Sequence, residues 1–122
     1  MAYQYDPENI FAKILRGEIP NQTVLETEHS LAFRDIHPQA PVHVLVIPKG
    51  AYVCYDHFAQ AASDAEIVDF NRAIGEVCKR EGLEAGGFRL ISNAGEAGVQ
   101  EVPHLHVHIL AGRPLGRMLQ KA

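Results

Sequence analysis

The sequence has 122 residues, which at about 150 residues per domain is room for one domain with a hydrophobic core. Because 47% of the residues are hydrophobic and 21% are charged, the composition excludes a disordered or low-complexity chain. A net charge of −4, without blocks of like charge, disfavours nucleic acid as a partner.

Membrane insertion and secretion are also disfavoured. The most continuous apolar stretch, residues 41–48, is interrupted by His43 and is far shorter than the roughly 20 residues of a spanning helix. The N-terminus lacks the basic and apolar regions of a secretory signal, and Cys54 and Cys78 form no CxxC pair. We expect a cytoplasmic protein with one domain over residues 1–122, its core spanning about 8–116 and a short tail at 117–122.

The first half of the chain predicts a short helix and then three strands. Asp6 as N-cap and Pro7 at the first helical position precede apolar residues at helical spacing, which indicates a helix over residues 7–16. Residues 23–26 and 31–35 are short β-prone runs separated by a polar turn, as in a β-hairpin. Pro38 and Pro41 prevent regular pairing, and residues 42–47 then predict a mostly buried strand.

The second half predicts one long helix and two more strands. Ser63 and Glu66 form a capping box, and apolar residues continue at helical spacing until Gly82. Residues 88–92 and 104–110 are typical of strands, with Gly95 and Gly98 in the turn-rich segment between them. Because strands and helices do not alternate, the pattern predicts an α+β domain: a mainly antiparallel five-stranded sheet with one long and one short helix.

Three of the seven histidines alternate with apolar residues in the segment HLHVHIL, residues 104–110. A strand sends successive side chains to opposite faces, so we expect the three imidazoles on one face and the apolar side chains against the long helix. Any polar residue would serve on a solvated face. Three side chains that titrate near neutral pH point instead to chemistry.

Two chemistries use such a row of histidines. An H-x-H pair can bind zinc when a third ligand, such as His43 or Glu101, completes the site. Alternatively, a neutral imidazole attacks phosphorus while neighbouring histidines bind the phosphoryl oxygens, and a covalent phosphoramidate divides the reaction into two steps. The residue pattern alone leaves both chemistries open.

Further segments of the chain follow a known pattern in the same order as HLHVHIL. They are Ile10-Phe11 with Lys13-Ile14 and Gly17-Glu18-Ile19-Pro20, residues 32–41 (AFRDIHPQAP), Val46-Ile47-Pro48, and residues 112–116 (GRPLG). In these segments the sequence resembles the histidine triad (HIT) superfamily, and within it the Hint branch of nucleotide-binding phosphoramidases. The resemblance covers nearly the whole chain and implies a HIT-like fold whose sheets join across a homodimer.

The resemblance implies catalytic roles for four histidines. His106, the middle residue of the triad, matches the nucleophile that attacks the α-phosphate of a nucleotide derivative and becomes transiently nucleotidylated. His108 and His43 match residues that contact the phosphate, and His104 matches a residue that supports the nucleophile. No metal or other cofactor is required for such a cycle.

The resemblance also implies a purine nucleotide site. Asp35 matches the carboxylate that accepts hydrogen bonds from the ribose hydroxyls, and Asn93 matches an asparagine on the phosphate side. The other nucleotide-binding residues implied, in the purine slot or in the loop before the triad, are Phe11, Ile14, Phe33, Ile36, Val99, Gln100 and Glu101. Ordinary core packing is the alternative for the apolar members, and a turn carboxylate is the alternative for Asp35.

The loop before the triad departs from the family pattern. Val99 stands where many members have a glycine, and Pro103 stands where an aromatic residue often precedes the triad. Glu101 replaces a small hydroxylic residue that donates a proton to the leaving group, and an ionised carboxylate cannot donate one. Either Glu101 is held protonated or water supplies the proton.

The function that the resemblance implies is that of a purine nucleoside phosphoramidase or nucleotidyl hydrolase. It would release AMP or GMP from a nucleoside phosphoramidate or related nucleotide through a nucleotidyl-histidine intermediate. One alternative is a non-catalytic purine nucleotide-binding or scaffold protein. Another is a metal-dependent hydrolase using H-x-H, which the lack of an evident carboxylate second shell beside the triad disfavours.

Overall fold

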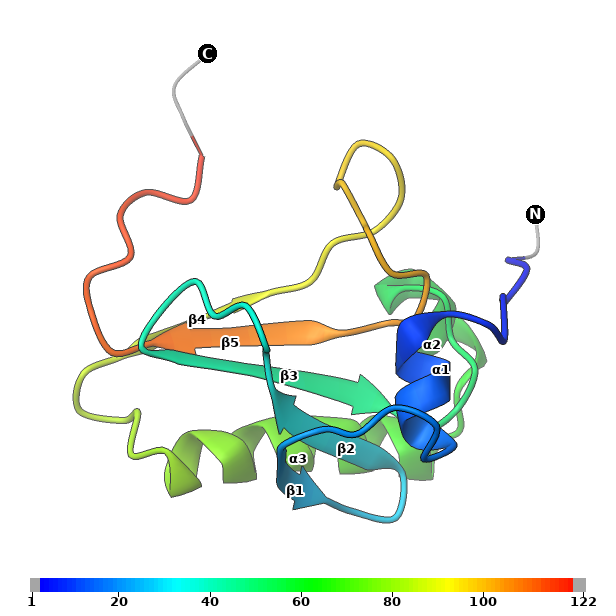
Figure 1. Cartoon of the computed structure of the whole chain (residues 1–122), viewed down its shortest axis with the longest axis horizontal. Coiled ribbons are helices and arrows are strands. Elements are labelled where there is room, and N and C mark those ends of the chain that lie inside the picture. Colours follow the sequence, from blue (N-terminus) through cyan, green and yellow to red (C-terminus); the bar gives the residue numbers. More distant parts are fainter. Residues whose placement is uncertain (1–2, 120–122) are drawn as a thin grey trace.

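Five antiparallel strands form one sheet in the order β1-β2-β3-β5-β4 (Figure 1). The computed structural model describes residues 3–119 of the chain. The strands are β1 (Thr23–Glu26), β2 (Ser30–Arg34), β3 (Val42–Pro48), β4 (Phe88–Ile91) and β5 (Val107–Ala111). The expected hairpin is β1–β2, and β5 is inserted between β3 and β4, so the predicted α+β class with an antiparallel five-stranded sheet is confirmed.

The alternation of side chains along β3 divides the interior into two layers. Val44 and Val46 belong to the core between the sheet and helix α3 (Asp64–Arg80), whereas Leu45 and Ile47 pack with helix α1 (Ile10–Leu15) on the opposite face. His108 of β5 lies opposite Leu45 in the register. The central strands therefore present histidine on the α1 face and valine or isoleucine on the α3 face.

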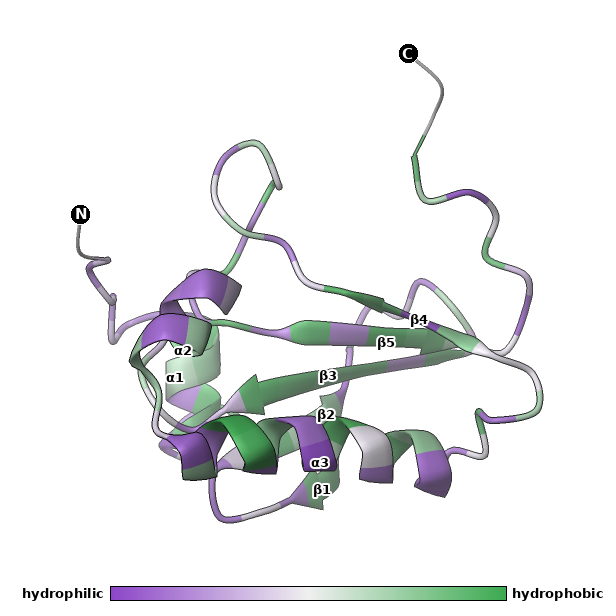
Figure 2. Cartoon of the chain, turned by 180° about the vertical axis from the view of Figure 1, so that it is seen from behind, coloured by the Kyte–Doolittle hydropathy of each residue, from purple (hydrophilic) through white to green (hydrophobic). Residues whose placement is uncertain are grey.

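Helix α3 covers one face of the sheet. It begins at the predicted capping box, in which the Ser63 hydroxyl accepts from the Glu66 backbone N–H and the Glu66 carboxylate accepts from the Ser63 N–H. Phe70, Ala73 and Val77 are its buried residues. Figure 2 shows α3 lying along β3 and β5, which are coloured mostly as hydrophobic. The histidine-bearing face of the sheet is therefore supported from behind by the core packed between the sheet and α3.

Helix α1 begins three residues later than predicted. Asn9, not Asp6, is the N-cap, because its side-chain oxygen accepts from the Ala12 backbone N–H at 2.9 Å. Asp6 and Pro7 form a turn before it. The helix stops at Gly17, which has the positive φ of 78° expected of a residue that ends a helix.

Two further predictions of local structure were incomplete. Helix α2 (Tyr55–Ala61) was not predicted, because its N-cap Cys54 makes no side-chain capping bond and only Phe58 of its residues is buried. Strand β5 begins at Val107 rather than at residue 104, because β4 ends opposite His108 and the Leu105 N–H bonds instead to Tyr52 O at 2.8 Å. Only His108 of the triad therefore lies within a regular strand.

Membrane-spanning helices were not expected from the sequence. No helix within residues 3–119 has the length and apolar character needed to cross a bilayer.

Candidate active site

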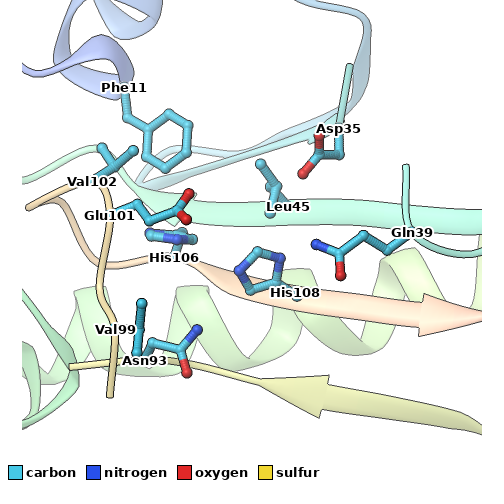
Figure 3. Close-up of a pocket in the computed structure, with 10 residues that line it drawn as sticks. All are labelled: Phe11, Asp35, Gln39, Leu45, Asn93, Val99, Glu101, Val102, His106 and His108. Atoms are coloured by element: carbon cyan, nitrogen blue, oxygen red, sulfur yellow. The ribbon is translucent and has the colours of Figure 1, made fainter. Parts of the chain in front are cut away.

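A pocket of about 360 Å³ lies on the α1 face of the sheet (Figure 3). It is lined by Phe11, Asp35, Gln39, Leu45, Asn93, Val99, Glu101, Val102, His106 and His108. Asp35 and Gln39 lie at one end, Glu101, Val102 and Val99 lie toward the other, and the two histidines lie between them. None of these ten lining residues is a lysine or arginine.

Seven of the residues that the sequence assigned to the site line this pocket. They are Phe11, Asp35, Asn93, Val99, Glu101, His106 and His108. Six others do not line it: His43, His104, Ile14, Phe33, Ile36 and Gln100. Most of these six lie in the layer behind the lining residues. The sequence therefore predicted the region that forms the site better than it predicted which side chains face the pocket.

His106 is held in one tautomer. Its Nδ1 lies 2.8 Å from the carbonyl oxygen of His104, and because a carbonyl only accepts, Nδ1 carries the proton. Burial lowers the pKa of His106, which favours the neutral ring. Nε2 then keeps a free lone pair. Within the described chain this atom has no hydrogen-bond partner, and it is not among buried unsatisfied atoms, so it is open to the pocket.

His104 is a support for His106 and does not reach the pocket. The side chain is fully buried, and its Nε2 donates to the Pro48 carbonyl at 2.8 Å. Its Nδ1 therefore accepts from the hydroxyl of Tyr5, in the N-terminal segment. Burial lowers the pKa of His104 to about 4, so the ring is neutral at physiological pH. The segment before β5 is tied in this way to both β3 and the N-terminus.

His43 and His108 form a directed hydrogen-bond chain. The Gln39 backbone N–H donates to His43 Nδ1 at 3.1 Å, so the proton of the neutral His43 ring lies on Nε2. Nε2 lies 2.9 Å from His108 Nδ1 and donates to it. Burial lowers the pKa of His43, and lowers that of His108 to about 4. The remaining N–H of His108, on Nε2, is thereby available to an oxygen atom in the pocket.

Asp35 lies where β2 has ended, and its position is fixed by two hydrogen bonds. Its backbone N–H donates to the His43 carbonyl, and its Oδ1 accepts from the His37 N–H at 2.8 Å. Its Oδ2 lies 3.4 Å from His43 Nε2. The carboxylate has free acceptor capacity toward the pocket, as a diol ligand requires.

One cluster in the described chain has the composition of a metal site. Ligand atoms of Asp35, His43 and His108 all lie within 4.8 Å of one another. This cluster differs from the H-x-H arrangement that the sequence left as an alternative, because both ring nitrogens of His104 and the Nδ1 of His106 are already hydrogen-bonded. A divalent ion at the cluster would displace the proton on His43 Nε2.

The loop before the triad is held by one amide side chain. Gln100 accepts from the Gly95 N–H and donates to the carbonyls of Val53 and Val102, which explains why it faces away from the pocket. Gly98 is required there, because a Cβ would lie 2.5 Å from the Ala94 carbonyl oxygen. The loop therefore has a defined shape where it borders His106.

Val99 adopts a conformation that valine rarely takes. Its φ is +56°, and it is the only non-glycine residue with positive φ among residues 3–119. A β-branched side chain in this region costs about 1–3 kcal/mol. Val99 lines the pocket, and 69% of the residue is exposed.

The expected purine-slot residues are only partly in place. Phe11 lines the pocket, with its ring edge-on to His106 at a centroid distance of 4.9 Å. Ile14 and Phe33 are buried in the core beneath α1, the alternative role considered for them. Ile36 is 81% exposed and lies outside the pocket.

Sequence reasoning missed three lining residues: Gln39, Leu45 and Val102. Leu45 could have been found, because it shares the strand parity of His43 in β3. Gln39 and Val102 lie in irregular segments where no periodicity predicts the direction of a side chain.

Comparison with known proteins gives a consistent result. The HIT domain profile matches residues 16–115. A 13.2 kDa HIT-like protein of Azospirillum brasilense is 60% identical over 99% of both chains, and the purine nucleoside phosphoramidase of Escherichia coli K12 is 41% identical over 92% of this chain and 93% of its own. A HIT family hydrolase from Legionella pneumophila has a TM-score of 0.79 at 38% identity, covering 89% of this chain and 96% of its own.

The buried histidines predict a pH-dependent stability. Since the pKa values of His104 and His108 are about 4 in the folded state and near 6.5 when unfolded, the unfolded chain binds more protons between these values. We expect the free energy of unfolding to fall as pH drops from about 6.5 toward 4. Urea unfolding at several pH values measures this. Constant stability between neutral pH and about pH 5, above the range of most carboxylates, would contradict the assignment.

Replacing Val99 by glycine should stabilise the fold. Glycine removes about 1–3 kcal/mol of backbone strain from the folded state, whereas the greater entropy of its unfolded chain lowers the stability by about 0.4–1 kcal/mol. We therefore expect the free energy of unfolding to rise by roughly 1 kcal/mol. Denaturant unfolding of Val99→Gly measures it. Gly98→Ala is the contrasting variant and should destabilise, because its Cβ meets the Ala94 backbone. Equal or lower stability of Val99→Gly would show that the conformation is not strained.

Proposed function

The chain belongs to the HIT domain family, and from that premise we propose that it is a purine nucleoside phosphoramidase or nucleotidyl hydrolase. The product would be AMP or GMP, released through a nucleotidyl-histidine intermediate. The observation that carries this proposal is the pairing of a free lone pair on His106 Nε2 with a free N–H on His108 Nε2 in one pocket. A nucleophile and a donor side by side are what transfer at phosphorus needs.

In the first step, His106 Nε2 attacks the α-phosphorus of the substrate and the bond to the leaving nitrogen or oxygen breaks. The electron pair of that bond goes to the leaving atom, which takes a proton from water. Charge growing on the phosphoryl oxygens is met by the His108 N–H and by the amide of Asn93. The positive charge on the substituted imidazole is stabilised through its Nδ1–H, which already bonds to the His104 carbonyl.

In the second step, water attacks the same phosphorus, one proton of that water passes to the solvent, and the bond to His106 Nε2 breaks. The ring takes back its electron pair and becomes neutral again, and the nucleoside monophosphate leaves. Because burial keeps the pKa of His106 low, the ring returns to the reactive neutral form rather than remaining protonated. His43 acts on both steps indirectly, by holding the proton of His108 on Nε2.

The nucleoside would bind at the Asp35 end of the pocket. The Asp35 carboxylate can accept from two ribose hydroxyls, and the apolar side chains of Phe11 and Leu45 are suited to a base or sugar face. Neither residue carries a donor or acceptor that separates adenine from guanine. We therefore propose a purine site without assigning the base.

We also propose a homodimer formed through β4. This strand is an edge of the sheet, and Phe88 and Leu90 on it are 45% and 44% exposed. Beside it lie hollows between β4 and α3, bordered by Gly75 in one case and by Tyr55 and Ile74 in another. Antiparallel pairing of two β4 strands about a two-fold axis would cover these groups and satisfy the open edge.

The cytoplasm is the proposed location. Cys54 and Cys78 are both free thiols in the described structure, and thiols persist in a reducing compartment.

The first experiment is AMP release from adenosine 5′-phosphoramidate by purified protein with excess EDTA. We expect turnover to survive EDTA and to fall at least about a thousandfold in His106→Ala, because the nucleophile is lost. His29→Ala, a histidine in the turn between β1 and β2, is the matched control and should retain activity.

Two outcomes would contradict the proposal. Turnover that stops in EDTA and returns with zinc would favour a metal-dependent hydrolase using Asp35, His43 and His108. Binding of AMP without turnover under any condition would favour the non-catalytic nucleotide-binding alternative.

The dimer is tested by Leu90→Glu. Placing a charge at the centre of the proposed interface should convert a dimer to a monomer in sedimentation at micromolar concentration. Ile10→Glu, which changes a 43% exposed residue of α1 on the opposite face of the sheet, is the control and should remain dimeric. A wild-type protein that sediments as a monomer would refute the proposed dimer.

A further inference from the structure

The pocket has a second carboxylate whose place in the proposed reaction is unassigned. Glu101 lies beside His106 and on the side away from Asp35 (Figure 3). The charge of Glu101 also acts to raise the pKa of His106, which agrees with this placement. If Asp35 marks the nucleoside end, Glu101 marks the end where the leaving group must lie.

The charge of the pocket is unusual for a site that binds a phosphorylated ligand. Its lining carries two carboxylates and no lysine or arginine, and its two histidines are neutral. A single phosphoryl group can be held by neutral donors. Additional negative charge near Glu101 would be repelled, so a leaving group that is itself anionic, such as a second phosphate, fits this end poorly.

The side chains next to Glu101 are apolar. Val99 and Val102 both line the pocket there. The loop that carries them is fixed by the three hydrogen bonds of Gln100, and Val99 has a backbone φ of +56° there. An apolar wall that ends in a carboxylate complements an alkyl chain that ends in a cation.

We propose that Glu101, Val99 and Val102 form a leaving-group subsite that selects nucleotidyl amides whose amine is an alkyl chain with a second, positively charged amino group. This proposal rests on the proposed function, since it names the substrate class of the same site. Glu101 contacts the part of the substrate that leaves and acts on specificity, while the attack on phosphorus remains that of His106.

Three adenosine 5′-phosphoramidates of matched chain length test the proposal. Their amines are 1,4-diaminobutane, pentylamine and 5-aminopentanoate, which end in a cation, a methyl group and an anion. For the wild type we expect kcat/KM to decrease in that order, by about threefold to fivefold per step, because Glu101 is at an exposed position. The preference should shrink at high salt.

Two variants separate Glu101 from the general charge of the protein. Glu101→Gln should bring the three substrates to within about twofold of one another while the pentylamine compound is still cleaved. Glu96→Gln removes an equal charge from the same loop, but Glu96 is exposed and does not line the pocket, so the wild-type order should persist.

The outcomes distinguish this inference from the proposed function. Equal cleavage of all three compounds by the wild type, or an unchanged order in Glu101→Gln, overturns the subsite while leaving the hydrolase in place. If no compound is cleaved, nor unsubstituted adenosine 5′-phosphoramidate, the hydrolase proposal fails. Calorimetric Kd values for the same three compounds then decide the subsite, and equal affinities would overturn it.

Discussion

The hydrogen bond from His106 Nδ1 to the His104 carbonyl is the constraint on which the geometry of the site depends. It leaves the lone pair on Nε2, which is the ring nitrogen that reaches the pocket. The bond forms because the His104 ring is locked between Pro48 of β3 and Tyr5 of the N-terminal segment. Through this one carbonyl, the contacts of His104 with the N-terminal segment and with β3 determine which ring nitrogen of His106 carries the proton.

A second row of contacts fixes the neighbouring ring in the complementary state. The Gln39 N–H, His43 and His108 are linked in one direction, so that His106 presents a lone pair and His108 presents a proton. Burial lowers the pKa of all three histidines concerned, which keeps both states at neutral pH. Chemically identical side chains two positions apart are given opposite roles by what lies behind them.

Periodicity made the sheet predictable, and its absence made other parts unpredictable. The β-branched run at residues 42–47 indicated a buried strand, the alternation in HLHVHIL indicated two faces with the histidines on one of them, and the capping box indicated the start of α3. Residues 104–106 continue the alternation in the sequence but do not form a regular strand, because the Leu105 N–H bonds to the Tyr52 carbonyl and not to a neighbouring strand. Helix α2 has no capping signal, and the direction of Gln39 depends on a loop, so tertiary contacts alone determine them.

The insertion of β5 between β3 and β4 has a consequence for biosynthesis. The other four strands of the sheet and α3 emerge from the ribosome before the strand that must occupy the gap. Until then β3 offers an open backbone edge and the α3 face lacks Val107 and Ile109, so the nascent chain exposes a template for strand pairing. Completion of the fold and completion of the reactive histidine row are consequently a single late event.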